Sequence, residues 1–208
     1  MNYKDMVSLL PYHIAGCPDF VAEKAIKDAV LSYCKRSSAY RVTLDPVLTV
    51  AGLFEYDIDL PRNTNITDTY SVIHGEKVLT PDTEQGANHA NPKWRTEKST
   101  PTHYIRPSNK LLLLVPVPIK SGENVTIHAA LKPSLTSTSI STDFVEDHVD
   151  GIMAGAMANL FNAHEMPWAN PQRAAKHEAE FGAHIRDAKS RADGRNGPTR
   201  RTVKYGGL

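Results

Sequence analysis

Histidine is the residue type in this chain best suited to metal or acid–base chemistry. Four of the nine histidines fall in the C-terminal region, namely His148, His164, His177 and His184. His177 and His184 are seven positions apart, which places them on one face of a helix. Two-helix metal sites use inward-facing Glu-x-x-His pairs. Here Glu178 precedes His184 by six positions and Glu146 precedes His148 by two, so neither spacing fits and no metal site is predicted.

The motifs of nucleotide-binding and hydrolytic enzymes are not in the sequence. It contains no GxxxxGK[ST], GxGxxG, HExxH or GxSxG motif. Cys17 and Cys34 are the only cysteines and form no CxxC pair, so we expect two free thiols. Glu55, Asp57 and Asp59 alternate with apolar residues, which favours the solvated face of a strand over a catalytic cluster. We expect no enzyme activity and no cofactor, with a metal-dependent hydrolase using helical His and acidic residues as an alternative.

Length and composition indicate an ordinary folded chain. Of its 208 residues, 40% are hydrophobic and 23% charged, and none of its apolar runs reaches the roughly 20 residues that span a membrane. The first residues lack a charged-then-apolar signal pattern, so we expect the product to stay in the cell that makes it. Residues 186–208 carry seven Lys or Arg against two Asp, a local +5 in a chain of net charge +1. Such a basic end predicts a docking tail, with a solvated end as the alternative.

A C-terminal helical pair dominates the hydrophobic pattern. We expect a helix over residues 144–163, a corner at residues 166–168 and a second helix over residues 170–192. The first helix has a broad apolar stripe, and its small residues between Ala154 and Ala158 allow another helix to come close. Asp143 followed by Glu146 predicts a capping box at its start. Asn170-Pro171 predicts the start of the second helix, because a capping residue is followed by proline.

The N-terminal part predicts two helices, and the middle of the chain predicts strands. A short helix is expected over residues 3–10 and a longer one from Pro18, as its first residue, to about Ser38. The spacing of apolar residues then changes to every second position. This alternation predicts about six strands in antiparallel hairpins, within residues 47–60, 69–80, 102–106, 110–115 and 125–131. Leu111–Val115 is continuously apolar, as expected of a strand covered on both faces.

One long polar stretch, residues 81–99, has Trp94 as its only large apolar residue. We predict a surface loop in which Trp94 either anchors the loop or contacts a neighbour. Loops of this length are unusual unless they are functional. A carbohydrate- or protein-binding β-module with Trp94 as its contact is therefore a further alternative.

These patterns together predict an α+β fold. The N-terminal helix and the C-terminal helical pair form a helical bundle, with an inserted antiparallel β sandwich or barrel-like domain and an extended C-terminal arm. The predicted domains are residues 1–42 for the N-terminal part of the helical domain, 43–135 for the β-domain, 136–193 for the helical pair and 194–208 for the basic arm.

An ordered set of short motifs covers nearly the whole chain. They are Leu9-Leu10-Pro11, Gly16-Cys17-Pro18, Leu44-Asp45-Pro46, Glu55-Tyr56-Asp57, Leu113-Leu114-Val115-Pro116-Val117-Pro118, Leu131-Lys132-Pro133-Ser134, Gly151-Ile152-Met153-Ala154-Gly155-Ala156 and Pro167-Trp168-Ala169-Asn170-Pro171. In this order they resemble the head-to-tail adaptor, or connector, proteins of tailed bacteriophages, particularly the short-tailed ones. Each motif alone is weakly specific, and the resemblance rests on the order in which the motifs follow one another along the chain.

The resemblance implies a non-enzymatic virion subunit at the head–tail junction, assembled in the host cytoplasm. Such proteins form a homo-oligomeric ring, typically twelvefold, around the DNA exit channel. The implied partners are the portal and the tail nozzle or other tail proteins; DNA only passes through, and no membrane is involved. The C-terminal arm of such proteins reaches the portal, which makes Arg195, Arg200, Arg201, Lys204 and Tyr205 the candidate docking residues. The candidate subunit-packing residues are Ile152, Gly155, Ala156, Leu160 and Trp168.

Overall fold

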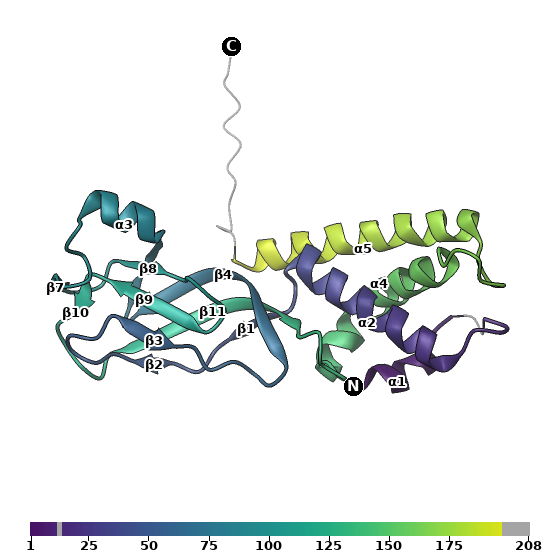
Figure 1. Ribbon diagram of the computed structural model, residues 1–208, viewed down its shortest axis with the longest axis horizontal. Coiled ribbons are helices and arrows are strands. Elements are labelled where there is room, and N and C mark those ends of the chain that lie inside the picture. The colour runs from purple at the N-terminus through teal and green to yellow at the C-terminus, as the bar shows by residue number, and fades with distance from the viewer. Residues whose placement is uncertain (12–13, 197–208) are drawn as a thin grey trace, which may run out of the picture. The chain divides into compact units, whose positions relative to one another are not determined.

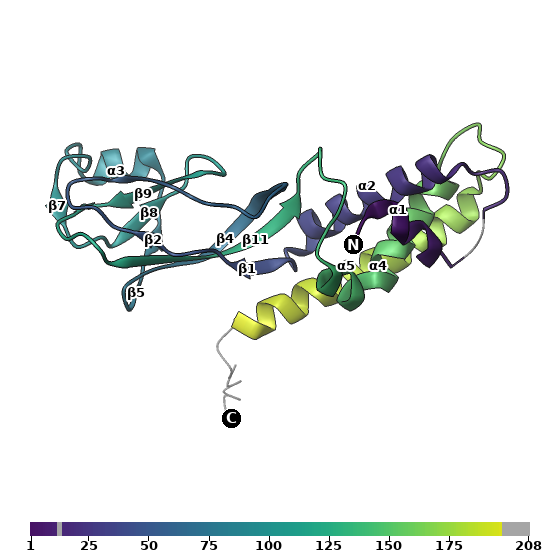
Figure 2. The same cartoon turned by 90° about the horizontal axis from the view of Figure 1, so that it is seen from below.

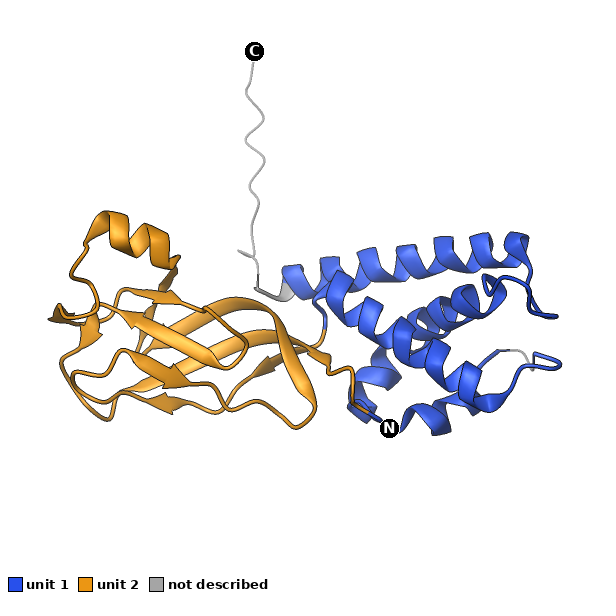
Figure 3. Cartoon of the chain, in the orientation of Figure 1, with its two compact units in different colours: residues 1–39, 138–208 blue, residues 40–137 orange. Residues whose placement is uncertain are grey.

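The chain folds into two compact units. The computed structural model describes residues 1–11 and 14–196 of the 208 residues. Residues 1–39 and 138–208 make up one unit, called here the helical unit, and residues 40–137 make up the other, called the β unit (Figure 3). The chain leaves the helical unit once and returns to it, so the β unit is an insertion. The predicted domain boundaries lie close to this division, and the status of the units as separate domains stays a prediction.

The helical unit is built on three long helices. Its elements are α1 (Tyr3–Met6), the 3-10 helix η1 (Val7–Leu9), α2 (Asp19–Ser37), α4 (Thr142–Phe161) and α5 (Pro171–Asn196) (Figure 1). The α4 helix packs against both α2 and α5. The chain start is fixed to the segment before α4, because the backbone N–H of Tyr3 donates to the carbonyl oxygen of Thr138 at 3.1 Å.

The α2 helix follows the predicted pattern closely. Its buried face is the set Ala22, Ala25, Ile26, Ala29, Val30, Tyr33, Cys34 and Ser37. It ends where expected, because Ser38 takes the left-handed conformation, with φ of 50°, that terminates many helices. Pro18 was expected as the first helical residue, and it instead occupies the N-cap position with extended backbone angles.

The start of α4 differs from the prediction. Ser141, not Asp143, is its N-cap, and no side chain caps the first turn. The predicted capping box is therefore wrong, because α4 begins two residues earlier than expected and Asp143 lies inside its first turn. The helix also bends at His148, whose φ of −132° and ψ of 15° are not helical. It ends at Phe161, two residues before the predicted end.

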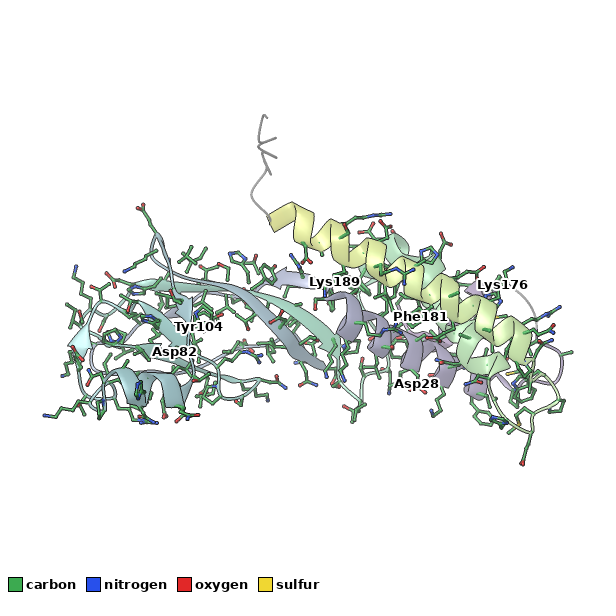
Figure 4. All side chains as sticks on the ribbon, turned by 90° about the horizontal axis from the view of Figure 1, so that it is seen from above. Asp28, Asp82, Tyr104, Lys176, Phe181 and Lys189 are labelled. Carbon is green, nitrogen blue, oxygen red and sulfur yellow. The ribbon has the colours of Figure 1, made fainter. Side chains whose placement is uncertain are left out.

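The α5 helix is longer than predicted. It starts at Pro171, preceded by Asn170, whose side-chain oxygen accepts a hydrogen bond from the backbone N–H of Arg173 at 3.0 Å. This is the predicted cap. The helix continues to Asn196, so residues 194–196 are helical and not part of an extended arm. Figure 4 labels Lys176, Phe181 and Lys189 along it; Phe181 is buried, while both lysines are exposed.

The β unit contains three sheets and one short helix. Its strands are β1 (Arg41–Thr43), β2 (Val47–Leu48), β3 (Glu55–Asp57), β4 (Thr64–His74), β5 (Lys77–Val78), β6 (Thr80–Pro81), β7 (Lys98–Ser99), β8 (His103–Ile105), β9 (Leu111–Val115), β10 (Val117–Pro118) and β11 (Asn124–Pro133). The helix is α3 (Glu84–Ala90). One sheet has the order β1-β11-β4-β5 with β2 also paired to β11, another has the order β3-β9-β8-β6, and β10 pairs with β7.

The two longest strands, β4 and β11, lie side by side in antiparallel register from Val125 opposite His74 to Pro133 opposite Thr64 (Figures 1 and 2). The predicted hairpin turn between β4 and β5 is confirmed. Gly75 there has φ of 60°, a conformation that favours glycine. The predicted mixed α+β fold class is also confirmed.

Two apolar clusters occupy the β unit, and β9 separates them. Leu112 and Leu114 belong to a core shared with β4 and β11 residues such as Val72 and Ile127. Leu113 and Val115, together with Ile105, Ala87 and Trp94, form the second cluster. Alternate residues of β9 are thus buried on opposite faces, which confirms that this strand is covered on both sides.

Two strand pairings are parallel, which corrects the purely antiparallel prediction. The strands β6 and β8 pair in parallel, as do β7 and β10. Parallel neighbours need a crossover connection of a dozen or more residues, commonly with a helix. The segment between Pro81 and His103 contains α3 and provides such a connection. The predicted surface loop over residues 81–99 is also corrected, because α3 and β7 lie within it.

Candidate assembly and docking surfaces

The predicted subunit-packing residues of α4 are used inside the chain itself. Ile152 and Ala156 are fully buried, and Leu160 is 2% exposed. Gly155 faces the Phe181 ring so closely that an added Cβ would lie 2.7 Å from Cε2 of that ring. The broad stripe is therefore covered by α2 and α5 of the same chain, and packing of these residues against a neighbouring subunit stays a prediction. The sequence shows how wide a stripe is, but not which helices cover it.

A second close approach involves Gly151 and Tyr33. An added Cβ at Gly151 would lie 2.7 Å from Cε2 of Tyr33 and 2.9 Å from Cβ of His184. The Tyr33 hydroxyl donates to the His184 carbonyl oxygen at 3.4 Å and lies 3.2 Å from Nδ1 of His148, at the bend of α4. Desolvation, with a further contribution from the charge of Asp187, raises the pKa of Tyr33 to about 12. This buried hydroxyl thus joins α2, α4 and α5.

Trp168, the remaining packing candidate, lies at the corner between α4 and α5. Its side chain is half-buried. Its Nε1 is buried, and no acceptor for it is found among the described residues. Glu165, in the same connection, has φ of 65°, in the left-handed region. A role of Trp168 in subunit packing stays a proposal.

The histidines singled out for chemistry have different surroundings, although His177 and His184 line the same groove. His177 is 7% exposed, stacks on Phe161 with ring centroids 5.8 Å apart, and lies 2.9 Å from Oε2 of Glu180. His148 contacts Tyr33, and His164 is exposed in the corner after α4. In residues 1–11 and 14–196, no group of three or more His, Cys, Asp or Glu side chains could hold a metal ion. His148 and His177 therefore act in packing.

Trp94 is an anchor of its own segment. It is 1% exposed, packs edge-on against Phe54 with centroids 5.7 Å apart, and donates from Nε1 to Oδ1 of Asn88 at 2.8 Å. The Arg95 guanidinium covers the ring at 4.2 Å. Of the two predicted roles the structure supports anchoring, and a contact of Trp94 with a neighbour stays a prediction.

The candidate portal-docking residues are mostly outside the described part. Arg195 belongs to α5, while Arg200, Arg201, Lys204 and Tyr205 lie outside the described residues. The exposed acidic residues of β3, Glu55 and Asp57, alternate with buried Tyr56 as predicted for a solvated strand face. No helix in the described part of the chain is long and apolar enough to cross a membrane.

The accessible features of the helical unit include a groove and exposed apolar side chains. The groove has a volume of about 300 Å³ and lies between α4, α5 and the segment after η1. Its lining includes Met153 and Met157 on the apolar side and Lys176 on the polar side. Phe20 is 72% exposed and Met166 is 47% exposed. This combination can contact another protein.

Comparison with known proteins gives one assignment. A family model described as SU10 adaptor protein matches residues 1–202. No curated protein matches the chain. The family match runs through both units and ends within the basic C-terminal segment.

Proposed function

The chain belongs to the SU10 adaptor protein family, and from this premise we propose that it forms a ring between the portal and the tail, around the DNA exit channel. The family is one of phage structural adaptors and not of enzymes. The chain is therefore a bacteriophage virion protein that works with other head or tail proteins. The match over residues 1–202 carries the proposal. It confirms the predicted head-to-tail adaptor family, while the short-tailed type stays a prediction.

Ring formation is the first part of the proposal, with twelve subunits as the predicted number. Since the α4 stripe is covered within the chain, the ring contacts are assigned to exposed groups of the helical unit. Phe20, in the first turn of α2, and Met166, after α4, are the most exposed large apolar side chains in the described part of that unit. Burial of such side chains between neighbours is favourable, because apolar area is removed from water.

Portal docking by the C-terminal arm is the second part. The segment after Asn196 contains Arg200, Arg201 and Lys204 and no acidic residue. Arginine pairs strongly with carboxylates through two parallel hydrogen bonds, so an acidic portal surface is the expected partner.

A binding experiment with purified portal rings tests the proposal. The full chain is expected to assemble on the portal as a ring seen by electron microscopy, with particle mass giving the subunit number. Deletion of residues 197–208 leaves α5 complete, so it should weaken attachment while the helical content is retained.

The contribution of arm charge to portal attachment is tested with the double substitution Arg200→Glu/Arg201→Glu. The control is Lys35→Glu, because Lys35 is an exposed lysine of α2. The double substitution is expected to weaken attachment and the control to leave it unchanged. Equal attachment of all variants would contradict the arm's role, and no ring on the portal would contradict the proposed function itself.

A further inference from the structure

Four exposed aliphatic side chains gather on two adjoining loops of the β unit. Leu48, Val50 and Leu53 are 57%, 51% and 43% exposed, and Ile119 is 50% exposed. The first three lie on and after β2, and Ile119 follows β10 directly. The loops touch, because the backbone N–H of Gly52 donates to the carbonyl oxygen of Pro118 at 2.8 Å. Residues 48–53 and 118–123 are called the tip from here on.

Thr49 holds the two loops of the tip together. It is 1% exposed, although its side chain is polar. Its hydroxyl donates to the carbonyl oxygen of Lys120 and accepts from the backbone N–H of Glu123, both at 3.0 Å. Its backbone exchanges two more hydrogen bonds, with Glu123 at 2.9 Å and Gly122 at 2.8 Å. Burying this hydroxyl is favourable only because both of its hydrogen-bonding roles are satisfied.

Tyr56 fixes the other end of the first loop. Its hydroxyl accepts from the backbone N–H of Val50 at 3.1 Å and donates to the carbonyl oxygen of Leu53 at 2.8 Å. The Ala51 N–H donates to the Ser121 hydroxyl at 2.8 Å. The aliphatic side chains therefore stand on a fixed backbone, so little conformational entropy remains to be lost when another protein covers them.

Two lysines lie on or beside the tip. Lys98 lies over Gly52, with its Nζ 3.6 Å from the position of an added Cβ, and Lys120 is exposed within the tip. Among the described residues neither lysine has an ion-pair partner. The one carboxylate of the tip, Glu123, is already 2.9 Å from Nε2 of the buried His74. A partner surface with carboxylates would therefore complement the tip.

The area and the charge argue against a self-complementary contact between two copies. Burying one aliphatic side chain removes roughly 100 Å² of apolar area, so four half-exposed ones offer about 200 Å². A stable interface buries about 800 Å² per partner. A two-fold contact would also oppose Lys98 and Lys120 to the same lysines. The tip is instead suited to insertion into a larger partner, where several copies in a ring act together.

We propose that the tip inserts into an apolar recess, rimmed by carboxylates, on a tail protein of the virion. This inference rests on the proposed function, in which the C-terminal arm takes the portal and leaves the β unit for the tail. The aliphatic side chains supply the buried contact, while Lys98 and Lys120 set its orientation.

The test uses the full chain and isolated tails and portal rings of the phage that encodes it. Leu53→Ser/Ile119→Ser removes two exposed contacts without changing the buried core, and should weaken tail binding by about tenfold or more. Val78→Ser is the matched control, since Val78 is 61% exposed on β5, outside the tip. Lys120→Glu should also weaken tail binding, and portal binding and subunit number should stay unchanged in all variants.

The outcomes separate the inference from the function on which it rests. Loss of tail binding in the tip variants alone, with unchanged circular dichroism, supports the inference. Unchanged tail binding overturns it, as does loss of the ring or of portal binding, which would assign the tip to a second copy or to the portal. If the unaltered chain binds neither portal nor tail, the proposed function fails, whatever the tip does.

Discussion

Replacing Gly155 by Ala would place a methyl group against a buried ring. An added Cβ would lie 2.7, 2.8 and 3.0 Å from three ring atoms of Phe181. Favourable carbon contacts are about 3.5–4.0 Å long, so the ring must move. It has little room, because Phe181 is 4% exposed and its ring packs against that of Tyr33 with centroids 6.0 Å apart.

The expected change in the free energy of unfolding is the difference between two opposing effects. Overpacking a core costs about 1–3 kcal/mol, and three simultaneous short contacts favour the upper end. Alanine gains about 1 kcal/mol over glycine in a helix interior. We therefore expect Gly155→Ala to lower the free energy of unfolding by about 2 kcal/mol and, for a helical unit of this size, to lower its Tm by about 10 °C.

Urea and thermal unfolding followed by circular dichroism provide the assay. Gly182→Ala is the matched control on α5, where the nearest atom to an added Cβ is the flexible end of Arg186 at 3.4 Å. This variant should be as stable as the unaltered chain or more stable. Gly155→Ala should also cost less in a Phe181→Leu background, because the smaller side chain leaves room. If Gly155→Ala stabilises the protein as Gly182→Ala does, the account of α4 packing within one chain is wrong.

Three further predictions concern buried groups. Cys17 is half-buried and Cys34 is fully buried, and desolvation raises the pKa of the Cys34 thiol. A thiol reagent should therefore titrate one cysteine in the native protein and two in denaturant. Trp94→Ala should destabilise the β unit by about 3–5 kcal/mol, measured by urea unfolding, and leave the unfolding of the helical unit unchanged. Because the pKa of Tyr33, about 12 when folded, is above its ordinary value of 10.0, its contribution to stability is complete below pH 10 and is lost as the pH rises to 12. Tyr33→Phe should therefore lose less stability than the unaltered chain between pH 9 and 11.5.

The sequence was most informative where local periodicity decides the structure. The apolar spacing of α2, the Asn170-Pro171 start of α5 and the continuous run Leu111–Val115 each correspond to an element in the structure. Gly75 gave the β4–β5 turn for the same reason, since its conformation depends on few neighbours. Such features need no knowledge of distant residues.

The rest depends on contacts between distant residues. The parallel pairing of β6 with β8 is set by tertiary packing around α3, which Thr83 caps through the backbone N–H of Gly86 at 3.0 Å. The α4 stripe shows the same limit, because nothing in its spacing distinguishes cover by α2 and α5 from cover by another subunit. The sequence did not predict the tip, because the hydroxyls of Thr49 and Tyr56 fix its loops through hydrogen bonds to backbone groups. Such hydrogen bonds leave no pattern in the sequence.

Locating the protein in the phage particle tests the account most directly. Antibody against the purified chain, or electron microscopy of particles carrying a tagged copy, would mark its position. The account predicts label at the head–tail junction, with a ring of the protein between the portal and the tail. Label on the capsid shell or the distal end of the tail, or none on intact particles, would contradict it.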